Sequence, residues 1–155
     1  MSKQPCLSVA LVLAVLGSHA ALADEAMKER SAAFTFKDPQ LAWGGCPPFL
    51  PKGCQIAVLH GDPSKDNADV FFKVPGGATI PPHWHTSAER MVLVSGKLNV
   101  TYEGQKVAAL KPGTYAYGPA KLPHKAVCAS KEPCVLFIAF ESPVDAVPVD
   151  SPAGK

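Results

Sequence analysis

Three histidines and one glutamate are the residues of this chain whose types and spacing suit metal binding. His83 and His85 lie two positions apart, so on an extended strand both side chains point to the same face. Glu89 follows at the start of an apolar run, where a buried carboxylate is costly unless a cation compensates its charge. His124 opens a later apolar run, and the fold must bring it to the other three residues. His60 precedes a Gly-Asp-Pro turn, and we expect it at the surface.

This donor set restricts the metal and its chemistry. Neutral imidazole nitrogens with one carboxylate suit Fe(II), Mn(II), Ni(II), Cu(II) or Zn(II) and offer little to calcium or magnesium. Four protein ligands leave two positions open on a six-coordinate ion, so substrate or oxygen could bind there directly. We expect Glu89 to be a permanent ligand, and the alternative is that it leaves the metal to act as a catalytic base. No nucleophile stands with a base and an orienting partner at a recognisable spacing, so covalent catalysis is not supported.

Candidate residues of a substrate cavity lie on the strands beside these ligands. If Glu89 points inward, the two-residue period of a strand sends Met91 and Leu93 inward as well. Tyr115 and Tyr117 share one face of another predicted strand. We take Met91, Tyr115 and Tyr117 as candidate lining residues, and the alternative for the tyrosines is that they fill the barrel.

The N-terminus has the pattern of an export signal. Lys3 precedes an apolar run over residues 7–16, and small residues lead up to Ala23. We therefore expect a secretory signal peptide over residues 1–23, cleaved near Ala23, and a periplasmic or secreted mature chain that begins near Asp24. A membrane anchor is the alternative, but the run is shorter than the ~20 residues that a bilayer requires.

Four cysteines remain after that cleavage, an even number in a chain sent to an oxidising compartment. Of the three possible pairings we favour Cys46 with Cys54 and Cys128 with Cys134, because each pair brackets a short stretch suited to a turn. A zinc site is the alternative. The spacings do not fit the short Cys-x2-4-Cys knuckles of structural zinc sites.

The rest of the chain is a series of short β-rich runs separated by glycine and proline, and it predicts one all-β sandwich or barrel domain. We expect an arm and loop over residues 24–53, a barrel over 54–142 and a loosely ordered tail over 143–155. We also expect Tyr102 in the core. The predicted strands cover residues 55–59, 70–74, 89–94, 97–102, 106–110, 114–117, 124–128 and 134–140.

The charge pattern bears on the partners. The formal net charge is +2, and the basic residues are scattered without a run or stripe. The sequence therefore contains no cluster of basic residues of the kind that binds nucleic acid, and we expect a small-molecule ligand instead.

The spacing around the first three ligands resembles the cupin superfamily, whose first signature is G-x5-H-x-H-x3,4-E-x6-G. Gly77, His83, His85, Glu89 and Gly96 match it at every fixed position. The stretches AVLHGDPSK and PPHWH also look like those of small secreted single-domain cupins.

The second cupin signature, G-x5-P-x-G-x2-H-x3-N, is matched in part. Gly113, Pro119 and His124 fall in register. Lys121 replaces the second glycine, which calls the usual tight turn before His124 into question. Cys128 replaces the asparagine, where a disulfide could take over a local hydrogen bond.

The resemblance implies a double-stranded β-helix, a jelly-roll barrel of six or more strands with the metal inside, in a chain that is often a homodimer. It also implies a His3Glu centre like those of cupin dioxygenases and related oxidoreductases. A metal-dependent isomerase or lyase on the same centre is an alternative, because a Lewis-acid metal stabilises enolates. A non-enzymatic periplasmic module that binds or senses a metal or small molecule is another.

Overall fold

The computed structural model describes residues 31–149, so the predicted signal peptide lies outside the described residues. Within that range the chain is all-β: it forms two antiparallel sheets and contains no helix, so nothing there could cross a bilayer as a helix. The strands are β1 (Trp43–Gly45), β2 (Gln55–His60), β3 (Ala68–Val74), β4 (Thr79–Trp84), β5 (Glu89–Ser95), β6 (Leu98–Tyr102), β7 (Ala108–Leu110), β8 (Tyr115–Gly118), β9 (His124–Cys128), β10 (Cys134–Phe140) and β11 (Val147–Pro148).

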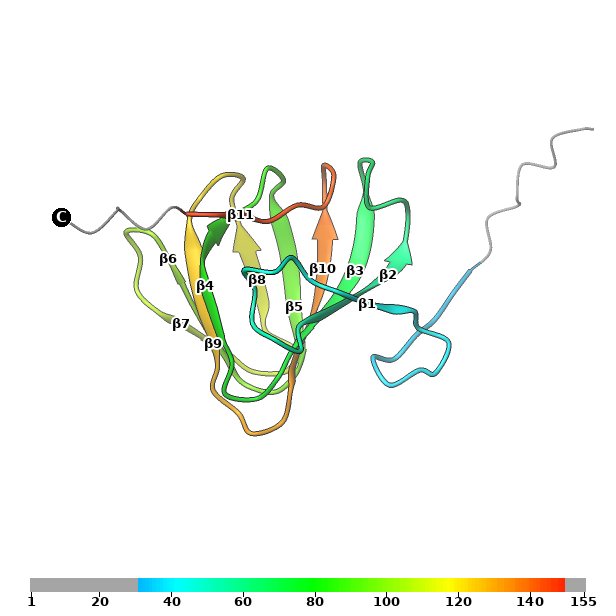
Figure 1. Ribbon diagram of the computed structural model, residues 1–155, viewed down its shortest axis with the longest axis horizontal. Helices are drawn as coiled ribbons and strands as arrows, with labels where there is room; N and C mark the ends of the chain where they lie inside the picture. The colour runs from blue at the N-terminus through cyan, green and yellow to red at the C-terminus, as the bar shows by residue number, and fades with distance from the viewer. Residues whose placement is uncertain (1–30, 150–155) are drawn as a thin grey trace, which may run out of the picture. The chain divides into compact units, whose positions relative to one another are not determined.

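The two sheets face each other across a common interior (Figure 1). The larger sheet has the strand order β1-β2-β3-β10-β5-β8, and the smaller has the order β11-β4-β9-β6-β7. Strands that are neighbours in a sheet are therefore often distant in sequence. This arrangement is expected for a jelly-roll barrel, and the predicted fold is confirmed.

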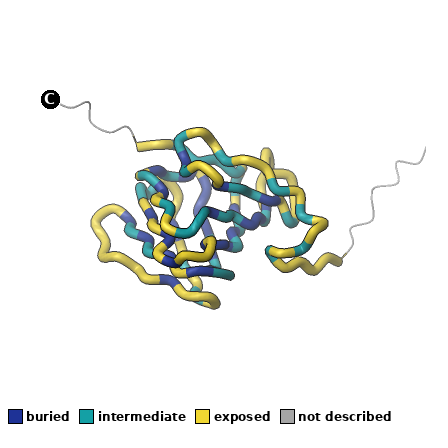
Figure 2. Tube along the Cα trace, turned by 60° about the horizontal axis from the view of Figure 1, so that its bottom comes forward, coloured by how far each residue is buried: buried dark blue, intermediate teal, exposed yellow. Residues whose placement is uncertain are grey.

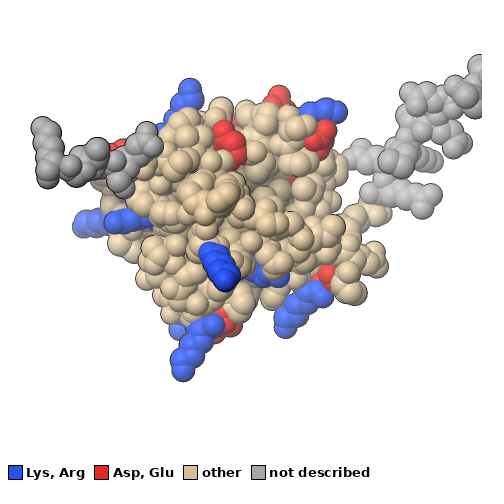
Figure 3. Space-filling view, in the orientation of Figure 1, with Lys and Arg blue, Asp and Glu red and all other residues tan. Residues whose placement is uncertain are grey.

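Alternation along the strands places the core between the sheets. In β5, Glu89, Met91 and Leu93 are buried, whereas Arg90 and Val92 are half-buried, as the two-residue period predicts. The same alternation of buried and exposed residues recurs around the barrel (Figure 2). Lysine and arginine side chains are scattered over the face shown in Figure 3, in line with their scatter along the sequence.

The turn before β9 forms although Lys121 replaces the glycine that is usual there. Lys121 has a φ of 61°, in the left-handed region that favours glycine and costs other residues about 1 to 2 kcal/mol. Its backbone N–H donates to the carbonyl of His85 at 2.8 Å. That hydrogen bond links the turn directly to a predicted metal ligand.

Both predicted disulfides are confirmed. Cys46 is bonded to Cys54, and Cys128 at the end of β9 is bonded to Cys134 at the start of β10, with Cα–Cα distances of 5.6 and 5.7 Å. Disulfides of this kind are typical of proteins in oxidising compartments.

The sequence missed three strands, and β4 shows why. Pro81 and Pro82 have no backbone N–H to donate, which argues against a central strand. The β4 ladder accommodates them with a register shift between Ile80 and His83. β1 and β11 are only three and two residues long. The sequence predicts a loosely ordered tail from residue 143, and in the described part of that tail Val147 and Pro148 form β11, which pairs with β4.

Candidate metal centre

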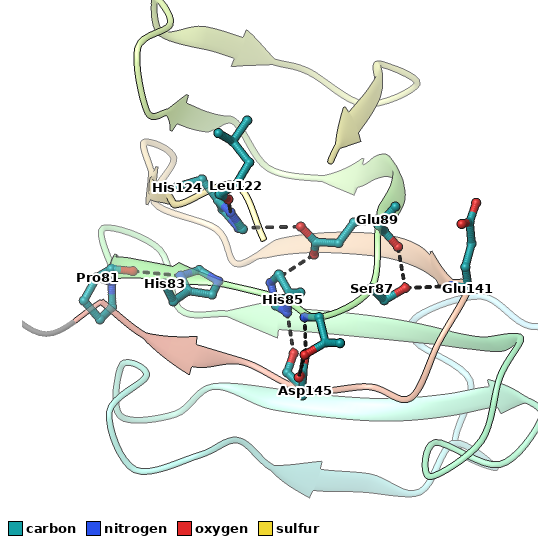
Figure 4. Close-up of polar contacts among 11 residues, drawn as sticks. Pro81, His83, His85, Ser87, Glu89, Leu122, His124, Glu141 and Asp145 are labelled. Carbon is teal, nitrogen blue, oxygen red and sulfur yellow. Dashed lines mark hydrogen bonds and ion pairs between the residues drawn. The ribbon is translucent and has the colours of Figure 1, made fainter. Parts of the chain in front are cut away.

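The predicted ligands lie close together, on or just after the strands β4, β5 and β9 (Figure 4). His83 lies near the end of β4, His85 just after it, Glu89 at the start of β5 and His124 at the start of β9. His83 and His124 are direct partners across the β4–β9 ladder, which brings the third histidine to the first two. The side chains of His85, Glu89 and His124 are at most 10% exposed.

Each histidine is oriented through its Nδ1 atom. His83 Nδ1 lies 2.8 Å from the carbonyl of Pro81, and His124 Nδ1 lies 3.2 Å from that of Leu122. His85 Nδ1 contacts the carbonyl of Asp145. A carbonyl only accepts, so each Nδ1 carries the proton and each Nε2 keeps a free lone pair. One nitrogen from each ring lies within 4.8 Å of the others, so the three histidines could hold a metal ion.

Glu89 extends into the same space. Its Oε1 lies 3.3 Å from His85 Nε2, and its Oε2 lies 3.6 Å from His124 Nε2. Burial raises the pKa of Glu89 to about 8. Burial lowers the pKa of His83, and it lowers those of His85 and His124 to about 4 and about 3. The imidazoles are therefore neutral near pH 7, as metal ligands must be.

A cavity of about 270 Å³ adjoins these four residues. Its remaining walls are mostly apolar and come from both sheets. Among the lining residues are Leu50, Ile56, Phe72, Ile80, Met91, Leu98, Val100, Leu110, Ala126, Leu136, Ile138 and Phe140. Met91 thus lines the cavity, where the sequence placed it.

Comparison with known proteins identifies the domain. A family model described as "Cupin domain" matches residues 70–140, which include all four predicted ligands. The domain belongs to the cupin superfamily. Comparison with curated protein sequences finds no match.

Solved structures share this cupin fold at low sequence identity. The DMSP lyase DddQ from Ruegeria pomeroyi DSS-3 is 20% identical with a TM-score of 0.61, over 74% of this chain and 64% of that one. KdgF from Halomonas sp. is 26% identical with a TM-score of 0.54, over 67% and 89%. The polyketide cyclase RemF from Streptomyces resistomycificus is 17% identical with a TM-score of 0.56, over 66% and 75%. The chain therefore spans less than two thirds of that DMSP lyase.

Two predicted lining residues lie outside the cavity of this cupin. Tyr115 and Tyr117 are 60% and 52% exposed and do not line the cavity, so the expectation for them is corrected. The reason is the register of β8 against β5. Ala116 is the partner of inward-facing Met91, so the tyrosines on either side of Ala116 point outward.

Tyr102 is a polar residue of the site that the sequence assigned simply to the core. It is the ladder partner of His124, and its buried hydroxyl has no hydrogen-bond partner among the described residues. A Cβ atom on Gly118 would lie 2.8 Å from that hydroxyl and 3.0 Å from Glu89 Oε2. Gly118 therefore leaves room for Tyr102 and Glu89 side by side. Burial and the Glu89 carboxylate both raise the pKa of Tyr102, which keeps the phenol protonated.

The segment after β10 is the other unpredicted part of the site. Asp145 accepts hydrogen bonds from the N–H of Thr86 at 2.8 Å and from its hydroxyl at 2.6 Å. Ser87 Oγ accepts from the N–H groups of Glu141 and Ser142 at 2.8 and 3.0 Å. These bonds hold the segment against the loop that carries His85 (Figure 4). No sequence signal links residues so far apart.

Proposed function

We propose that this cupin is an exported metalloprotein that holds one divalent transition metal on His83, His85, Glu89 and His124. Fe(II), Mn(II), Ni(II), Cu(II) and Zn(II) are the candidate metals. The observation that carries the proposal is the convergence of one nitrogen from each of three imidazole rings, each ring held by a carbonyl at Nδ1, with one buried carboxylate. A cation among them would compensate the buried charge of Glu89.

We assign the centre to oxidoreductase chemistry of the dioxygenase type. A bound six-coordinate metal would supply Lewis acidity and two positions for an oxygen donor and O2. Both oxygen atoms would enter the substrate, so the reaction requires no separate reductant. Glu89 and the histidines would fix the metal, and the apolar walls would exclude water.

A lyase or isomerase on the same centre is the second candidate, favoured by the fold shared with a DMSP lyase and a polyketide cyclase. Such a reaction needs a base that is free to take a proton. Among the carboxylates that line the cavity, Asp145 is occupied by Thr86 and Glu89 is assigned to the metal. We therefore place this candidate second. O2 consumption that matches product formation would separate the two.

Export follows from the predicted signal peptide over residues 1–23 and agrees with the two disulfides. The mass of secreted protein should correspond to a chain that begins near Asp24, with both disulfides formed. A mature protein that still carries residues 1–23 would contradict this part of the proposal.

Metal analysis tests the centre itself. The mature protein should bind one equivalent of metal, and His83→Ala or His124→Ala should abolish that binding and the accompanying rise in melting temperature. At a hundredfold excess over Kd the rise corresponds to about 2.7 kcal/mol. The matched control is His60→Ala, because His60 is exposed and lies outside the cluster. Loss of metal in that control, with His83→Ala unaffected, would overturn the ligand assignment.

A nitrosyl probe tests whether the metal can bind substrate directly. Iron-loaded protein exposed to nitric oxide should give the paramagnetic signal of a directly bound nitrosyl, because two positions remain open. An iron centre that takes no nitric oxide would favour the non-enzymatic binding or sensing role.

A further inference from the structure

We propose that the substrate is a small, mainly apolar molecule with one oxygen-donor head group and no second anionic group. The inference rests on the proposed function, because the head group would bind the metal held by the four ligands. It adds to that function the class of molecule that the cavity selects.

The size and lining of the cavity set the body of the ligand. A volume of about 270 Å³ lies just below the ~300–1,000 Å³ of pockets that hold drug-sized ligands, so the molecule is smaller than those. Leu98, Val100 and Leu136 are buried wall residues that offer only hydrocarbon. A polar or charged group placed against them would lose its water without gaining a partner.

The charges around the cavity exclude a second anionic group. None of the described residues that line it is lysine or arginine. The nearest arginine along β5, Arg90, is 41% exposed and pairs with Glu141 on the outside of the barrel. Asp145, the carboxylate of the lining that is not assigned to the metal, would repel an anion.

The charge of the loaded centre allows one negative oxygen. A divalent ion, one Glu89 carboxylate and three neutral imidazoles sum to a single positive charge. A monoanionic head group such as a carboxylate, phenolate or enolate would neutralise it. A second anionic group would leave an unpaired negative charge among apolar side chains, which is unfavourable.

The exposed part of the cavity lining, which we call the opening, is also apolar and therefore suits this ligand. The exposed residues of the lining are Pro47, Val58 and Pro63, and Val58 is 43% exposed. A ligand would therefore pass an apolar rim as well as apolar walls.

Six-carbon carboxylates test the inference. The mature protein is loaded with Co(II), whose visible bands report the ligands of the ion, and titrated with hexanoate, adipate and acetate. Hexanoate should shift the bands and bind about tenfold or more tightly than acetate, which has the head group without the body. Adipate should bind about tenfold or more weakly than hexanoate, because its second carboxylate meets apolar walls.

The outcomes separate this inference from the proposed function. A protein that takes up no cobalt would overturn the proposed function and the inference together. A cobalt-loaded protein that binds adipate or acetate as tightly as hexanoate would overturn the inference and leave the metal centre standing.

A variant at the opening gives an independent test. Val58→Lys adds a cation at an exposed lining position, so the fold should tolerate it. Adipate affinity relative to hexanoate should rise about two- to fivefold, as expected for a partly solvated ion pair. Val107→Lys is the matched control, because Val107 is 61% exposed and lies outside the lining. An unchanged ratio of adipate to hexanoate affinity in Val58→Lys would show that the apolar walls do not discriminate between the two ligands, and would contradict the inference.

Discussion

The cavity has a polar region and an apolar region. The three histidines and Glu89 line the polar region, whereas Leu98, Val100 and Leu136 line the apolar region and present only hydrocarbon. The polar region is held by hydrogen bonds to backbone carbonyls, and the apolar region by close packing between the sheets. The polar region provides ligands for a cation at some cost in stability, because burial disfavours the charged form of Glu89. The apolar region supplies the stability that makes this cost tolerable.

Truncation of the apolar wall should have the largest effect on stability. Leu136→Ala should lower the free energy of unfolding by about 2 to 5 kcal/mol, because it truncates a buried side chain and leaves empty space in its place. Metal stoichiometry should not change, since Leu136 is not among the ligands. Denaturant unfolding and metal analysis measure the two effects, with the exposed Val107→Ala as control. Loss of metal in Leu136→Ala would show that the two regions are not separable.

The pH dependence of the metal-free protein should distinguish the histidines from Glu89. Burial lowers the pKa of His85 to about 4 and of His124 to about 3, from 6.5, so the unfolded chain binds more protons below pH 6.5 and stability falls with falling pH. Burial raises the pKa of Glu89 from 4.5 to about 8, so the folded chain keeps a proton that the unfolded chain releases, and stability falls as pH rises toward 8. Stability should peak near pH 6.5, with slopes of about 1.4 kcal/mol per pH unit per proton.

Denaturant unfolding from pH 4 to pH 9 checks this profile. Glu89→Gln should remove the alkaline decline and keep the acidic one, because glutamine does not titrate. An alkaline decline that persists in Glu89→Gln would assign it to another group.

Removal of the unpartnered hydroxyl should have the smallest effect, and one of opposite sign. Tyr102→Phe should raise the free energy of unfolding of the metal-free protein by about 1 kcal/mol, because a buried polar group without a partner is destabilising. Tyr115→Phe is the matched control and should change stability by less than about 0.5 kcal/mol, since Tyr115 is exposed. A large loss of stability in Tyr102→Phe would mean that the hydroxyl has a partner in solution.

Local rules within the sequence were enough for much of the fold and for the ligand candidates. The two-residue period of a strand placed Glu89, Met91 and Leu93 inward and put His83 and His85 on one face, and the resemblance to the first cupin signature then singled them out as ligands. Short intervals between cysteines were likewise enough to pair them correctly. Each of these inferences depends on residues close together in the chain, where backbone geometry leaves few choices.

Only the tertiary structure decided which polar groups surround the candidate metal centre. Tyr102 faces His124 and Glu89 because β6 pairs with β9, and Asp145 reaches His85 because the chain returns across the barrel after β10. The register of β8 against β5 likewise turned Tyr115 outward. A shift of one residue in any of these pairings would reverse the face of every side chain on the strand. Such registers are fixed by packing between distant segments, which no local pattern in the sequence encodes.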